Sequence, residues 1–306
     1  MAIKYLDSKR IRGSSTGDGA LGSGLKAYYK FDESTGNIVN VASTITGNST
    51  IGTGANIVFA GTGTTTYEVT GTPTNLGNAV TLPQTSTSSG IYGTFGDSTT
   101  DFDFMWSGTP KWTMCFWAKQ SASAVSNTTL IKNNNGEGTK GFEIYWYGTS
   151  TVKLRFNMTN GSSGNPAGRP FNFADFTDFS TDGNWHFYSY VMDGSLGSNQ
   201  LKVTRDGGTT QNFSKTSGGF AASGTSYSKM TLRTTYSSIG SFVPPEQSFC
   251  ELMIFDTVLT DAQLTRIYNA GAGRLLSNAG TTDEKATLVN NVPASDANWT
   301  TVTALT

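Results

Sequence analysis

The chain has 306 residues, of which 14% are charged and 12% aromatic, and its formal net charge at pH 7 is −1. This balance gives no reason to expect a nucleic acid or an anionic membrane as a partner, and no apolar stretch approaches the ~20 residues that cross a bilayer. The aromatic content excludes a disordered chain. Short β-prone runs between turns rich in Gly and Asn predict an all-β protein.

The first 24 residues predict a basic arm followed by a linker. Residues 13–24 are rich in Gly and Ser, which is typical of flexible linkers. Such an arm often contacts a partner, although a solvated arm without a role is the alternative. No apolar stretch follows the charges, so the segment does not resemble a signal peptide. The basic residues of this expected assembly arm are Lys4, Lys9, Arg10 and Arg12.

The body of the chain predicts a series of strands, beginning with "LKAYYKFDESTGN" from residue 25 and weak, short ones up to residue 100. Residues 112–120, "WTMCFWAKQ", are apolar at nearly every position and predict a central strand covered on both faces. "TLIKN", "GFEIYWYG" and "VKLRFNMT" predict a meander, because Asn- and Gly-rich turns separate them. "NWHFYSYVMDG" and "NQLKVTRDGG" predict a hairpin.

The last predicted strand leads directly into one short helix. Thr260 and Gln263 have the spacing of a capping box, with Leu259 and Leu264 at the flanking apolar positions. Gly271 is placed to end the helix in the left-handed conformation. Residues 277–306 are polar and predict a tail.

These segments, in this order, resemble the laminin-G-like jelly rolls of the concanavalin A-like lectin/glucanase superfamily and, more distantly, the pentraxins. The matching motifs are the Phe-Asp-Glu turn at 31–33, the Gly-x-Trp-His strand at 183–186 and the helix "LTDAQL" at 259–264. The resemblance covers residues 25–276. It implies an antiparallel jelly-roll β-sandwich with one short helix after the last strand, between the arm of residues 1–24 and the tail of residues 277–306.

His186 is the only histidine of the chain and therefore a candidate catalytic base. In a strand it shares a face with Tyr188 and Tyr190, while Trp185 lies on the other face, which we expect to be the inner one. A catalytic triad also needs a nucleophile and an orienting acid, which the sequence does not place. We interpret His186 as a packed, hydrogen-bonded residue and expect no catalytic residue. The resemblance agrees, because the Trp-His pair is a fold marker in that family.

The superfamily also contains glycoside hydrolases, which use two carboxylates ~5 Å apart when they retain configuration. The Glu-x-Asp-x-x-Glu pattern of the related endoglucanases is absent from this sequence. Asp101 and Asp103 have a spacing of two but lie in a segment that predicts a loop, and Asp32 and Glu33 are adjacent. Hydrolysis therefore stays a less favoured alternative to a protein that is not an enzyme.

The resemblance also implies calcium, which many relatives bind through loop carboxylates. Ca²⁺ takes six to eight oxygen ligands, whereas the loop before the closing strand, "YSSIGSFVPPEQS", has Glu246 as its only acid. We therefore expect no metal ligand and no cofactor. Cys115 and Cys250 either form one disulfide or remain two buried thiols, and the sequence leaves both possibilities open.

Exposed aromatic residues are the remaining candidates for binding. Residues 160–180 are long for a loop, and they either fold over the body or contact a partner. Tyr145 and Tyr147 share one face of a predicted strand and can stack on a sugar ring, although strand aromatics mostly form core. The expected glycan or partner contacts are Tyr145, Tyr147, Phe171, Phe173, Phe176 and Phe179.

We therefore expect a structural or binding protein without enzymatic activity. One hypothesis is a subunit of a larger assembly, located at a virion surface as a capsid decoration or fibre protein, or extracellular. It is favoured by the basic arm, the lack of a secretion signal and an opening, "MAIKYLDSKRIRGSS", similar to those of jelly-roll proteins of marine microbes and their viruses. The other is a carbohydrate-binding or adhesion lectin outside any virion. The expected partners are other protein subunits and glycans, without nucleic acid and without membrane insertion.

Overall fold

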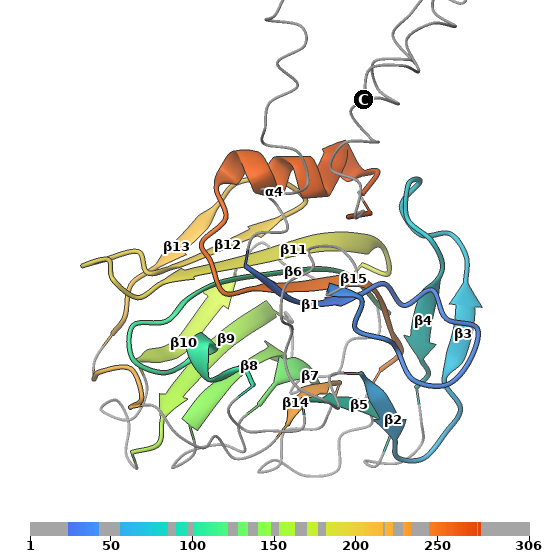
Figure 1. The fold of residues 1–306 in the computed structure, drawn as a ribbon, viewed down its shortest axis with the longest axis horizontal. Coiled ribbons are helices and arrows are strands. Elements are labelled where there is room, and N and C mark those ends of the chain that lie inside the picture. The colour runs from blue at the N-terminus through green and yellow to red at the C-terminus, as the bar shows by residue number, and fades with distance from the viewer. Residues whose placement is uncertain are drawn as a thin grey trace, which may run out of the picture.

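The structure is a computed structural model that describes residues 24–42, 56–84, 90–96, 101–121, 128–133, 140–147, 153–162, 170–176, 182–216, 218–222, 229–233, 245–273 and 275–276. Two antiparallel sheets form a sandwich, and one short helix lies on the outside of one sheet (Figure 1). The predicted all-β sandwich with a helix after its last strand is thus confirmed. The tail 277–306 and the arm residues Lys4, Lys9, Arg10 and Arg12 lie outside the described residues.

The sheet beneath the helix, here called the helix-side sheet, has eight strands in the order β13-β12-β11-β6-β15-β4-β3, with β1 paired to β15. Strand β6 lies between β11 and β15, which confirms the predicted central strand, and β11–β12 is the predicted hairpin. The strands are β1 (Leu25–Tyr29), β3 (Thr66–Val69), β4 (Ala79–Leu82), β6 (Lys111–Gln120), β11 (Trp185–Asp193), β12 (Leu201–Arg205), β13 (Gln211–Phe213) and β15 (Gln247–Phe255).

The second sheet has seven strands in the order β10-β9-β8-β7-β14-β5-β2. The predicted meander is present as β7–β8–β9, and β10 extends it within the segment that was expected to be a loop. The strands are β2 (Val58–Ala60), β5 (Tyr92–Phe95), β7 (Thr128–Lys132), β8 (Lys140–Tyr147), β9 (Lys153–Asn160), β10 (Phe171–Phe176) and β14 (Met230–Leu232).

Aromatic side chains fill the space between the two sheets. Trp112 of β6 stacks on Phe142 of β8 with ring centroids 5.8 Å apart, and Phe116 stacks on Tyr190 of β11 at 6.1 Å. These rings are almost fully buried. Burial of one large apolar side chain stabilises a fold by roughly 1.5–3 kcal/mol, so this layer contributes substantially to stability.

The two faces of β11 are reversed relative to the sequence-based expectation. Tyr188 and Tyr190 point into the inter-sheet core, whereas Phe187 and Trp185 point to the outer side beneath the helix. Trp185 is only partly buried there. The sequence correctly predicts which residues of β11 share a face. Because the helix-side sheet is covered on both faces, hydrophobicity alone does not distinguish its inner face from its outer face.

Helix α4 (Asp261–Tyr268) begins with the predicted capping box: the Gln263 amide donates to Thr260 Oγ1 at 3.3 Å, and the Thr260 amide donates to Gln263 Oε1 at 2.9 Å. Leu264 is buried on the outer face of the helix-side sheet. The helix ends earlier than expected, because Asn269 already has a left-handed φ of 49°. Asn tolerates this conformation, and its side-chain amide donates to the Gly273 carbonyl at 2.9 Å, so Gly271 is not the residue that ends the helix.

Strand β15 contains a bulge with a buried carboxyl group. Glu251 has a left-handed φ of 54° and accepts a hydrogen bond from Tyr28 Oη, which in turn accepts one from the Leu276 amide at 3.3 Å. Burial raises the pKa of Glu251 to about 8, so the group is mostly protonated at neutral pH. Near the bulge, Cys115 and Cys250 are buried free thiols, and no disulfide joins them.

Candidate functional site

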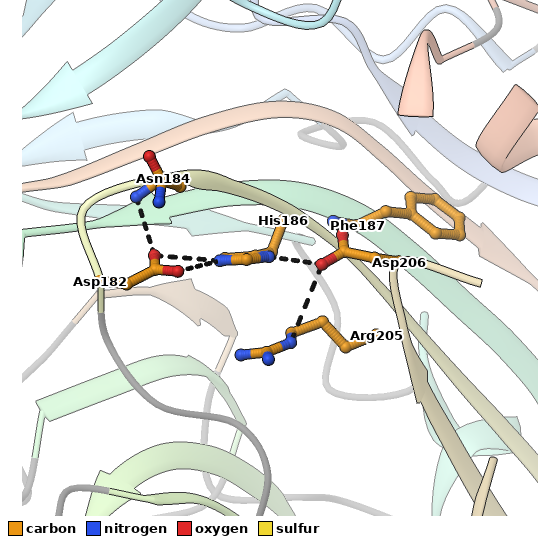
Figure 2. Close-up of polar contacts among 6 residues, drawn as sticks. All are labelled: Asp182, Asn184, His186, Phe187, Arg205 and Asp206. Atoms are coloured by element: carbon orange, nitrogen blue, oxygen red, sulfur yellow. Dashed lines mark hydrogen bonds and ion pairs between the residues drawn. The ribbon is translucent and has the colours of Figure 1, made fainter. Parts of the chain in front are cut away.

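His186 lies at the start of β11 between two carboxylates, as Figure 2 shows. Its Nδ1 is hydrogen-bonded to Asp206 Oδ2, in the turn that follows β12, and its Nε2 lies 3.0 Å from Asp182 Oδ1. Asp182 precedes the strand and also accepts the Asn184 amide at 2.9 Å. The ring therefore connects the segment before β11 to the turn after β12.

The electrostatics of this contact favour a positively charged imidazole. The hydrogen bond to Asp206 raises the pKa of His186, against the partial burial of the ring, and Asp182 adds to the effect. With both ring nitrogens hydrogen-bonded to carboxylates, a protonated ring has no lone pair with which to accept a proton. Asp206 also accepts the Phe187 amide at 2.8 Å. His186 is thus packed and hydrogen-bonded, as the sequence indicated, and it fastens two chain segments together.

Two of the other acids considered from the sequence stabilise local turns. Asp103 opens the 3-10 helix η1 (Asp103–Met105) and accepts the Ser107 hydroxyl at 2.9 Å. Glu33 accepts the Val39 amide at 2.7 Å. Within the described part of the chain, no group of three His, Cys, Asp or Glu side chains is arranged to hold a metal ion. In that same part, no helix is long and apolar enough to cross a membrane.

The outer face of the second sheet carries a set of polar and aromatic side chains that we call the polar face. In β8 and β9, apolar residues that point into the core alternate with the residues of this face. The strand register aligns Thr129, Tyr145, Arg155 and Asp175 in one row across β7, β8, β9 and β10. The members of the polar face are Thr129, Lys132, Glu143, Tyr145, Tyr147, Arg155, Asn157 and Asp175.

Arg155 is the centre of the polar face. Its guanidinium binds Asp175 in a bidentate manner, with Nη2 donating to Oδ2 at 2.9 Å and Nε donating to Oδ1. The guanidinium carbon also lies 3.6 Å from the centroid of the Tyr147 ring and 6.0 Å from that of Tyr145. The cation–π contact with Tyr147 and the fork on Asp175 together hold the guanidinium in place.

A second row runs beside the first and consists of Lys132, Glu143 and Asn157. The Asn157 side-chain amide donates to Glu143 Oε1 at 2.8 Å. Burial lowers the pKa of Lys132, while the charge of Glu143 acts in the opposite direction. Both rows therefore place acids beside bases, and the polar face is hydrophilic without being strongly charged.

The structure separates the predicted aromatic contacts into different environments. Tyr147 is 40% exposed, whereas its neighbour Tyr145 is only 3% exposed. Phe171 and Phe176 are buried in the inter-sheet core and are therefore not surface contacts. The strand register shifts between residues 171 and 174, so two residues five positions apart both point inward. Phe179 and the side chain of Phe173 lie outside the described residues.

Of the polar face, the sequence predicted only Tyr145 and Tyr147, and it did not predict the central pair, Arg155 and Asp175. The alternation in "VKLRFNMT" places Arg155 and Asn157 on one face and was visible in the sequence. The pairing of Arg155 with Tyr145 needs the register of the β8–β9 hairpin, and its pairing with Asp175 needs strand β10, which the sequence did not reveal.

Comparison with known proteins gives neighbours by structure alone: no family model and no curated protein matches the sequence. The binding domain of botulinum neurotoxin DC in complex with SialylT has a TM-score of 0.53 and 13% identity, over 82% of this chain and 52% of that one. A structure of botulinum neurotoxin type C, which depends on two ganglioside molecules to get into cells, has a TM-score of 0.52 with the same identity and coverage.

The receptor binding domain of botulinum neurotoxin D has a TM-score of 0.50 and 11% identity, over 82% of this chain and 54% of that one. At these identities the similarity shows a shared β-sandwich fold. The chain spans about half the length of the solved structures it matches.

Proposed function

We propose that this chain is a glycan-binding module without enzymatic activity, and that Tyr147 on the polar face stacks against a sugar ring. The observation that carries the proposal is the exposed Tyr147 ring, held next to Arg155 while Asp175 fixes the guanidinium. Aromatic rings bury a large apolar area and carry a polar edge, which suits the apolar face and the hydroxyls of a sugar.

The charges of the polar face favour a neutral sugar over an acidic one. Asp175 neutralises Arg155 through two hydrogen bonds, so the guanidinium is not available as an isolated cation. Arg155 is buried, whereas the side chain of Asp175 is 30% exposed, so the carboxylate can accept hydrogen bonds from the hydroxyls of a sugar. The glycan partners of the neurotoxin domains support glycans as the ligand class.

Two finer assignments belong to the same proposal. The laminin-G-like identity of residues 25–276 is supported by the order of strands followed by a capped helix. Display on a virion exterior, with residues 1–24 as the anchoring arm, is supported by the basic residues Lys4, Lys9, Arg10 and Arg12. In such an assembly the sandwich presents its polar face to glycans, while the arm contacts other protein subunits.

A glycan array with neutral and sialylated oligosaccharides tests the binding function. We expect the wild-type protein to retain neutral glycans and Tyr147→Ala to bind them roughly tenfold more weakly, since an aromatic stacking contact contributes ~0.5–1.5 kcal/mol beyond its buried area. Tyr147→Phe keeps the ring and should bind like the wild type. Val58→Ala removes an exposed apolar residue from the opposite edge of the same sheet and is the matched control. Retention of no glycan, or equal binding by Tyr147→Ala, would refute the proposal.

A further inference from the structure

A small cavity lies between helix α4 and the outer face of the helix-side sheet, at the hairpin of β11 and β12. It has a volume of about 150 Å³, and its lining includes Phe187, Ser189, Thr204, Thr210, Asp261 and Tyr268. The polar face belongs to the outer side of the other sheet, so the two locations are on opposite sides of the sandwich (Figure 1). We propose that this cavity is a second, independent binding pocket that takes one neutral sugar residue.

The aromatic wall of the cavity is held rigidly. Tyr268, the last residue of α4, stacks on Phe187 at a centroid distance of 5.7 Å and on Trp117 at 5.8 Å. The turn after β12 approaches this ring closely at Gly207, where a Cβ atom would lie 2.8 Å from Tyr268 Cδ1. Gly207 also has a left-handed φ of 62°. Only glycine meets both conditions without strain, so the shape of the cavity depends on this residue.

The hydrogen bonds of His186 with Asp182 and Asp206, here called the clasp, fix the same turn. Asp206, next to Gly207, is hydrogen-bonded to His186, and its backbone amide donates to the Phe187 carbonyl at 2.9 Å. The Gly208 amide donates to the Arg205 carbonyl at 2.9 Å, which closes the turn. The wall opposite α4 is thus built by hydrogen bonds that need no ligand, and the pocket is preformed.

The polar groups of the cavity are hydroxyls and one carboxylate. Ser189 is 2% exposed and lines the cavity. Thr204 Oγ1 and Thr210 Oγ1 lie 3.0 Å apart, so one of the two hydroxyls donates to the other and the second still has a proton to donate. The hydroxyls of Ser189, Thr204 and Thr210 therefore supply hydrogen-bond donors and acceptors to the cavity.

The chemistry of these groups selects the ligand class. Asp261 is the only charged residue among the described residues of the lining, so these residues do not suit a phosphate or another anion. Hydroxyls, a carboxylate acceptor and an aromatic ring together suit a polyhydroxylated ring. The volume of about 150 Å³ is smaller than the ~300 Å³ of pockets for drug-sized ligands, so the cavity suits a ligand no larger than a single sugar residue.

The proposal is tested by NMR titration of the full-length, ¹⁵N-labelled protein with glucose, galactose, mannose and N-acetylglucosamine, each up to about 50 mM to detect millimolar affinity. We expect one of these sugars to shift the amide signals of Gly207, Gly208 and Thr265. Asp261→Asn, an exposed substitution that keeps the shape of the side chain, should raise the Kd at least about tenfold by weakening the acceptor. Ser189→Val should also weaken binding.

Tyr147→Ala is the matched control, because it disrupts only the polar face and should leave these shifts unchanged. This control distinguishes failure of the pocket from failure of the proposed function. Shifts with methylammonium but with no sugar would identify a cation site and overturn the inference. The absence of any sugar-induced shift at Gly207 and Gly208, or the same Kd for Asp261→Asn, would overturn it as well.

Discussion

Replacement of Glu251 by Gln should change the pH dependence of stability. The pKa of this buried carboxyl is about 8 in the fold, because burial disfavours its charged form, and 4.5 is its ordinary value. A group with a raised folded pKa stabilises the fold fully below the unfolded pKa and loses that contribution as the pH rises through the folded pKa. The wild-type protein should therefore lose roughly 5 kcal/mol of stability between about pH 4.5 and pH 8 through Glu251 alone.

Glu251→Gln has no proton to lose and keeps an oxygen that accepts the hydrogen bond from Tyr28. The variant should be less affected by the rise in pH, so that its free energy of unfolding exceeds that of the wild type by several kcal/mol at pH 8.5 and by little at pH 5. Urea unfolding followed by tryptophan fluorescence at pH 5, 7 and 8.5 measures this difference. A difference that does not grow with pH would show that Glu251 ionises normally in the fold.

The remaining predictions concern the clasp around His186, the two tryptophans on the outer face of the helix-side sheet, and the arm. His186→Ala should lower the free energy of unfolding by about 1–2 kcal/mol at pH 6 and by less at pH 9. The pKa of His186 is raised in the fold, so the ring stabilises the fold only while it is protonated. Equal losses of stability at both pH values would contradict a charged clasp. Trp185→Ala should lower the free energy of unfolding by roughly 1–2 kcal/mol and Trp117→Ala by roughly 3–5 kcal/mol, because Trp117 is almost fully buried and Trp185 is not. Thermal unfolding of both variants measures this difference. A larger loss for Trp185→Ala than for Trp117→Ala would refute the assignment of the strand faces. Deletion of residues 1–13 should abolish co-sedimentation with the purified parent particle and leave the fold of 25–276 intact. Attachment of the full chain should weaken from about 0.15 M to about 0.5 M salt, because the arm is basic. Equal sedimentation of the truncated chain would exclude the arm as the anchor.

The elements whose signals are local could be predicted from the sequence. The near-continuous apolar run of β6 indicated a central strand, and the spacing of Thr260 and Gln263 identified the start of α4. The helix end was missed by two residues, because Asn269 takes the left-handed conformation that was assigned to Gly271.

The features that depend on neighbouring strands could not be predicted. Trp185 was assigned to the wrong face because helix α4 makes the outer face of β11 apolar as well. Phe171 and Phe176 were expected at the surface because residues 160–180 were interpreted as a loop, whereas they belong to β10, in which a register shift turns both rings inward. The Arg155–Asp175 pair joins residues of two strands, and only the register brings it beside Tyr147.

The position of a bound glycan on the protein tests the central claim most directly. The neutral oligosaccharide that binds best on the array is titrated into ¹⁵N-labelled protein, and the Arg155 Nε–H signal is followed together with the backbone amides. Glycan binding at the polar face should shift the signals of Arg155, Asp175 and Tyr147, and Tyr147→Ala should remove these shifts. A glycan that shifts other signals while those of β8, β9 and β10 stay unchanged would contradict the polar face as the glycan-binding site.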